Sequence, residues 1–176
     1  MTKERDNQRS KVFKAEDKAR KGDERPLPKV DDIERYLTRN MGRKTLERRY
    51  GETIMGRMTK VADGRGTRHA LAYGGYKIGI PLWARSEWVV LHEMAHIIHS
   101  RINGAKSRRQ PMPAHAANLV GGASHGWQFC AIFVDLVRYC CGAEAAEKLK
   151  TEFKAGKVRY KKPRTVEADS SIRIAA

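Results

Sequence analysis

Apolar residues repeat with two different periods along this chain, and the change of period separates predicted helices from predicted strands. Spacings of three and four residues predict helices over residues 31–42, 45–50, 86–102, 125–141 and 143–155. Between the second and third helices, apolar and polar residues alternate, which predicts strands over residues 53–61, 69–73 and 76–80. This order indicates an α+β fold in which a small antiparallel meander precedes a long helix.

The two most strongly patterned helices carry the predicted core. The first begins at Ser86, whose hydroxyl is a favourable N-cap, and is expected to stop at Asn103-Gly104. Its apolar stripe consists of Trp88, Leu91, Ala95, Ile98 and Ile102. The stripe of the second consists of Phe129, Ile132, Phe133, Leu136, Val137 and Cys140. Both stripes need a partner, so we expect the two helices to pack together.

Composition divides the chain into three regions. Residues 1–29 are charged and mixed in sign, so we expect a partly flexible segment in which Val12 and Phe13 dock as a short strand or turn. Residues 30–155 form the predicted domain, and residues 156–176 form a basic tail that we also expect to be partly flexible. No run of about 18 apolar residues exists, which excludes a membrane span.

The charge balance favours a polyanionic partner. Lysine and arginine number 36 against 20 aspartate and glutamate, a formal net charge of +16, which points to nucleic acid first. A charged surface that only maintains solubility is the alternative. The basic residues are not interleaved with aromatic ones as in single-strand binders. The three cysteines form no Cys-x-x-Cys pair and are odd in number, which with the polar N-terminus predicts a cytoplasmic protein.

Chemistry is concentrated in residues 92–96, which read His-Glu-x-x-His inside an apolar run. On a helix, His92 and His96 lie one turn apart on one face, so both imidazoles can reach one metal ion. Glu93 is one step round the helix and can take a proton from a metal-bound water. A five-residue pattern with three fixed positions also occurs by chance, so the third ligand decides the interpretation.

The third ligand is expected to be a histidine, because residues 97–134 contain no aspartate or glutamate. His99 lies seven residues after His92, roughly 10 Å along the helix axis, which is too far for both to bind one ion. His99 is therefore expected to line the groove or lie at the surface. His115 lies in a basic loop, where a structural or solvent-facing role is expected. Asp135 and Glu144 are more remote candidates.

His125 is the preferred third ligand. It stands at the start of the second patterned helix, and its spacing from Phe129, Ile132 and Leu136 puts it on the buried face. A helix N-terminus also disfavours the imidazolium form, and a metal ligand must be neutral. The alternative is a capping or core histidine. The predicted zinc site is therefore His92, His96 and His125, with Glu93 as the catalytic residue.

The two motifs together, His-Glu-Met-Ala-His at 92–96 and His-Gly-Trp-Gln-Phe at 125–129, resemble the pair found in SprT-like (Spartan-like) zinc metalloproteases. A closer resemblance is to small metallohydrolases with a His-Glu-x-x-His motif found in actinobacteria and their phages. It covers most of residues 9–155, including the sequence RSKVFKAE at 9–16. The resemblance implies a zincin-like α+β fold, zinc bound by His92, His96 and His125, and Glu93 as general base.

Two departures limit what the resemblance implies. SprT-like proteases often carry a C-terminal cysteine zinc ribbon, and this chain has no cysteine after Cys141. DNA-dependent proteolysis therefore does not carry over with the motifs. The ImmA/IrrE-like metallopeptidases often have a histidine near position 99, but their third ligand is a downstream glutamate, which residues 97–134 lack. That family ranks below the SprT-like one.

The expected function is that of a zinc-dependent metallohydrolase, specifically a metallopeptidase acting on a protein or peptide substrate. The last predicted strand, residues 76–80, is a candidate edge on which an extended peptide could pair. Candidates for stabilising the oxyanion are Tyr73, Tyr76, His99 and His115. The alternative is a basic nucleic-acid-associated protein in which the zinc is structural.

Overall fold

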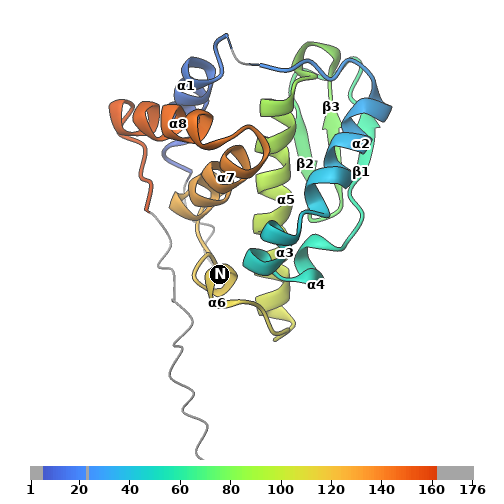
Figure 1. The fold of residues 1–176 in the computed structure, drawn as a ribbon, viewed down its shortest axis with the longest axis vertical. Helices are drawn as coiled ribbons and strands as arrows, with labels where there is room; N and C mark the ends of the chain where they lie inside the picture. The colour runs from blue at the N-terminus through green and yellow to red at the C-terminus, as the bar shows by residue number, and fades with distance from the viewer. Residues whose placement is uncertain (1–5, 23, 162–176) are drawn as a thin grey trace, which may run out of the picture.

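The computed structural model describes residues 6–22 and 24–161 and has an α+β architecture (Figure 1). Its helices are α1 (Arg9–Ala19), α2 (Val30–Met41), α3 (Lys44–Tyr50), α4 (Glu52–Met55), the 3-10 helix η1 (Leu82–Ala84), α5 (Glu87–Ser107), α6 (Ala114–Ala117), α7 (Trp127–Cys140) and α8 (Ala143–Ala155). Its strands are β1 (Lys60–Asp63), β2 (Leu71–Tyr73) and β3 (Lys77–Ile80). Within the described residues, no helix is both long and apolar enough to cross a membrane.

Helix α5 is the centre of the molecule. It lies between the sheet on one side and α7 on the other, and α8 packs against α7 (Figure 1). The Ser86 hydroxyl accepts a hydrogen bond from the Val89 N–H at 3.5 Å, which confirms the predicted N-cap. The helix does not stop at Asn103-Gly104 but continues to Ser107, because Gly104 keeps helical dihedrals and the first left-handed residue is Arg109 (φ 52°).

The sheet is mixed, so the predicted antiparallel meander is wrong. The strand order is β1-β3-β2, with β3 parallel to β1 and antiparallel to β2. After β1 the chain forms β2, which does not pair with β1. A tight turn after β2 then brings the chain back, and β3 pairs with both strands from between them. Because β3 is central, with Ile78 and Ile80 fully buried, the free edge expected there belongs to β2 and β1 instead.

The N-terminal region forms helix α1 and not the short strand or turn expected around Val12 and Phe13. Its inward positions follow the helical spacing of three and four: Val12, Ala15, Glu16 and Ala19. The pattern was hidden in the sequence because one of these positions is a glutamate. α1 packs against α8, and the Arg159 N–H donates to Gln8 Oε1 at 2.8 Å. Most of the predicted basic tail, residues 162–176, lies outside the described residues.

Candidate metal centre

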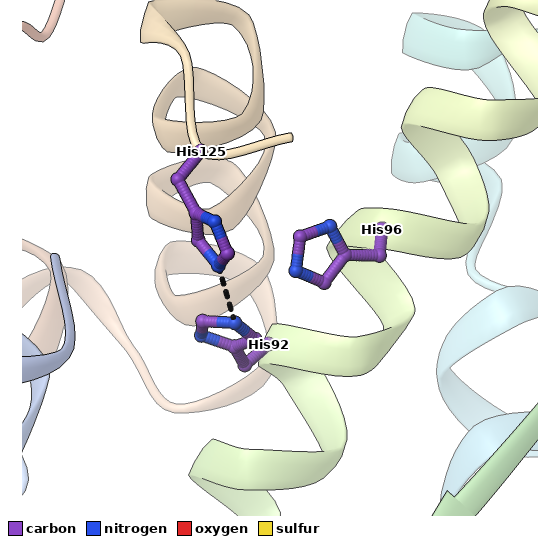
Figure 2. A group of neighbouring side chains, drawn as sticks. All are labelled: His92, His96 and His125. Atoms are coloured by element: carbon purple, nitrogen blue, oxygen red, sulfur yellow. Dashed lines mark hydrogen bonds between the residues drawn. The ribbon is translucent and has the colours of Figure 1, made fainter. Parts of the chain in front are cut away.

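Three histidines from two segments converge in the structure. His92 and His96 project from successive turns of α5, and His125 comes from the turn before α7 (Figure 2). One ring nitrogen from each lies within 4.8 Å of the others, and the Nε2 atoms of His92 and His125 are 3.3 Å apart. A tetrahedral zinc with bonds of about 2.1 Å holds its nitrogens about 3.4 Å apart. Small side-chain rotations therefore suffice for the three rings to bind one ion.

His125 lies close to His92 and His96, but not on the buried helical face that the sequence pattern predicts for it. α7 begins at Trp127, with Gly126 as its N-cap, so His125 precedes the helix and is not on its buried face. The turn before it contains Gly122, whose φ is +86°, and an added Cβ there would clash with the Gln128 side chain. The turn that leads to His125 therefore packs closely against the first turn of α7.

The environment of the three rings suits a metal ligand set. His92 and His125 are buried and His96 is half-buried. Burial lowers the pKa of His125 to about 4, even though its hydrogen bond to Asp6 acts in the opposite direction. Burial and the neighbouring His92 hold the pKa of His96 well below its ordinary value. His96 and His125 are thus held in the neutral form that binds a metal, whereas His92 bonds to a carboxylate; an all-nitrogen ligand set suits zinc.

Two carboxylates from the N-terminal region contact the far sides of these rings. Glu16 Oε2 lies 2.7 Å from His92 Nδ1, and Asp6 Oδ2 lies 2.7 Å from His125 Nδ1. Burial acts to lower the pKa of His92, but the charge of Glu16 and its hydrogen bond raise it overall. Neither Glu16 nor Asp6 is among the site residues that the sequence predicts. The available signal was the helical spacing of Val12, Ala15, Glu16 and Ala19, together with the RSKVFKAE segment.

Glu93 lines the same cleft as the three histidines. This cleft has a volume of about 500 Å³, and one wall is formed by residues at and beside β2: Ala70, Leu71, Ala72 and Gly74. Arg9 and Phe13 of α1 also line it. Burial raises the pKa of the Glu93 carboxyl to about 7, partly opposed by the nearby His92 and by the Ala72 backbone N–H. A buried carboxyl with a pKa near neutrality can exchange protons at physiological pH.

The other candidate residues lie outside the histidine cluster. His99 Nε2–H donates to the Gly121 carbonyl at 2.6 Å, which ties α5 to the turn leading to His125. His115 Nε2 lies 3.1 Å from Asp135 Oδ2, and Arg49 bonds to the same oxygen at 2.7 Å. Both His115 and Asp135 are therefore structural. Glu144 is exposed on α8.

Three of the four oxyanion candidates lie away from the cleft wall. Tyr73 and Tyr76 are exposed and, like His115, are not among the residues that line the cleft. His99 does line it, but its Nε2 is bonded to the Gly121 carbonyl.

Comparison with known proteins gives no match: no protein-family model, no curated protein and no solved structure is significantly similar to the chain. The resemblance to SprT-like proteases therefore rests on the two motifs and stays a prediction, as does the zincin-like description of the fold.

Proposed function

We propose that the chain is a zinc-dependent metallohydrolase, and specifically a metallopeptidase. The observation that carries the proposal is the convergence of His92, His96 and His125 in a cleft that Glu93 also lines. A structural zinc site usually has four protein ligands and is closed, whereas a catalytic one has three and an accessible fourth position. Three histidines beside a cleft of about 500 Å³ match the catalytic pattern.

Zinc held by these histidines would act as a Lewis acid and lower the pKa of a water toward about 7. Glu93 accepts the proton of the attacking water and returns it to the leaving nitrogen. Burial raises the pKa of Glu93 above that of an exposed glutamate, which makes the carboxylate a stronger base for this transfer. That burial follows from the position of Glu93 on the side of α5 that faces Ala72 of β2.

The proposed substrate is an extended peptide that lies along β2. This strand is at an edge of the sheet, and residues at and beside it form one wall of the cleft. An edge strand has unpaired backbone groups that a peptide can use for strand addition. The predicted pairing surface thus moves from β3 to β2.

Substitution of Glu93 by glutamine tests the proposal. Gln keeps the size of the side chain but cannot accept the proton, so we expect hydrolysis of an unfolded protein substrate to fall by about 100-fold or more. Zinc content and melting temperature should remain close to those of the unsubstituted protein. Glu34→Gln, at an exposed glutamate of α2, is the matched control and should retain full activity.

The alternative function, a nucleic-acid-associated protein with structural zinc, has the net charge of +16 in its favour. It predicts no hydrolysis by the unsubstituted protein, and nucleic-acid binding that is unchanged by Glu93→Gln and weakens steeply with salt. The peptidase proposal fails if the zinc-loaded protein cleaves no peptide bond, or if Glu93→Gln leaves cleavage intact.

A further inference from the structure

The N-terminal region contacts the predicted metal centre through four side chains. Asp6 and Glu16 bond to two of the histidines, and the Phe13 ring stacks on His92 with ring centroids 5.1 Å apart and an interplanar angle of 11°. The Gln8 amide donates to the backbone carbonyl of His125. These residues precede the His-Glu-x-x-His motif by more than 70 positions.

We infer that Glu16 and Asp6 are positioning residues of the metal centre, which orient His92 and His125 for zinc. The inference rests on the proposed function, because it assumes that the three histidines bind zinc. Each carboxylate accepts a hydrogen bond from Nδ1–H of one ring. That bond fixes the tautomer in which Nε2 carries the lone pair, and in both rings Nε2 faces the centre of the cluster.

The contact geometry favours this role over one in holding the fold together. α1 packs against α8, and its other inward positions, Val12, Ala15 and Ala19, are buried apolar residues that need no carboxylate. Glu16 is only 4% exposed, and burying a carboxylate without a partner is costly. The hydrogen-bond partner that the structure gives its carboxylate is His92 Nδ1. An apolar residue would pack better at this position if packing were its purpose.

The negative charges near the histidines also support a positioning role for Asp6 and Glu16. Three carboxylates lie close to the histidines. Asp6 and Glu16 bond to two of the rings, and Glu93 lines the same cleft. They offset the positive charge of a divalent cation in a buried environment, where charge interactions are less screened than at the surface. A carboxylate bonded to a ligating imidazole also raises its basicity toward the metal.

Zinc affinity, measured by competition with a chromogenic chelator, tests the inference in the full-length chain. We expect Glu16→Gln and Asp6→Asn each to weaken zinc binding by about 10-fold or more, since loss of such a partner typically costs 10–100-fold. Asp17→Asn is the matched control, because Asp17 is an exposed carboxylate on the same helix that pairs with Arg20. It should bind zinc like the unsubstituted chain.

A second readout separates positioning from a merely structural role. The visible absorption spectrum of the cobalt(II)-substituted protein reports the ligand geometry, and we expect it to change in Glu16→Gln and Asp6→Asn but not in Asp17→Asn. The melting temperatures of the metal-free variants should stay near that of the metal-free parent. Asp6 lies near the start of the described chain and is partly exposed, so Asp6→Asn keeps the test decisive if Glu16→Gln does not fold.

The outcomes for the inference and for the proposed function are distinct. If the unsubstituted chain binds no zinc, the proposed metal centre is wrong. If it binds zinc and the folded variants match Asp17→Asn in affinity and cobalt spectrum, the metal centre stands and the positioning role of the two carboxylates is refuted.

Discussion

At the residue scale, the histidines of this chain are distinguished by what each ring contacts besides the cluster. His92 and His125 bond to carboxylates and turn their other nitrogen toward each other. His99 bonds to a backbone carbonyl, and His115 belongs to a separate group with Asp135 and Arg49. Burial alone therefore does not identify a ligand, since His99 is as buried as His125.

A pair of alanine substitutions tests this distinction. We expect His125→Ala to weaken zinc binding by more than about 100-fold, because it removes one of three ligands. His115→Ala should leave zinc affinity unchanged but lower the free energy of unfolding by about 1–3 kcal/mol, because a buried hydrogen bond to Asp135 is lost. Chelator competition and urea unfolding measure the two quantities. Equal zinc affinity in the two variants would show that the site is wrongly assigned.

The sequence alone places His92 and His96 beside each other, because their relative position depends only on helical spacing. Residues four apart must share a face, so His92 and His96 converge whatever the tertiary fold. His125 does lie close to these two histidines, but it precedes α7 and does not occupy the helical face from which the sequence places it. Asp6 and Glu16 depend on how α1 docks, a long-range contact that no local pattern encodes. Glu16, which occupies an inward position, also interrupts the apolar pattern that would predict α1.

At the scale of elements, Arg101 connects the end of α5 to the segments that flank the sheet. Arg101 is 4% exposed, and its guanidinium donates to the Ile54 carbonyl at 2.8 Å and to Thr59 Oγ1 at 2.9 Å. It also donates to the carbonyl of Gly75, in the turn between β2 and β3. Burial lowers the pKa of Arg101 to about 10. This one side chain therefore holds the α4–β1 connection and the β2–β3 turn against α5.

Substitution of Arg101 by methionine should destabilise the protein without altering the metal centre. Methionine matches much of the side-chain volume but leaves several buried oxygens without a donor, so we expect the free energy of unfolding to fall by about 3 kcal/mol. Arg108→Met, at an exposed arginine just beyond the same helix, should change it by less than about 0.5 kcal/mol. Urea unfolding measures both, and equal values would contradict the anchoring role of Arg101.

The strand order illustrates what period-two patterns leave undetermined. Alternation located the strands approximately, but residues 53–61 include α4, and only Lys60–Asp63 are paired. Pairing partners are chosen by turn geometry and by which strand buries both faces. β3 takes the centre because Ile78, Gly79 and Ile80 are all buried, whereas β1 and β2 are partly exposed. The burial of each strand depends on the helices that cover the sheet, and the alternation pattern does not give their positions.

At the scale of the whole molecule, the net charge of +16 opposes the proposed binding of a divalent cation. A strongly basic protein repels a divalent cation at long range, but charges farther apart than about 8 Å are largely screened at physiological salt. Asp6 and Glu16 act at much shorter distance, through hydrogen bonds of 2.7 Å to the rings of His125 and His92. The local carboxylates can therefore set the affinity of the centre, while the remaining surface keeps its positive charge.

Zinc binding should stabilise the whole chain, because its ligands come from segments that meet only in the folded state. His92 and His96 lie on α5, and His125 lies about 30 residues later in the turn before α7. At free zinc of about 100 times the dissociation constant, linkage adds about 2.7 kcal/mol to the free energy of unfolding. For a chain of this size that corresponds to a rise in melting temperature of roughly 5–10 °C. Differential scanning calorimetry with added zinc or with a chelator measures the shift, and His125→Ala, which lacks one ligand, should show little of it. A melting temperature that is independent of zinc in the unsubstituted chain would mean that the three histidines do not bind the metal tightly in the folded state.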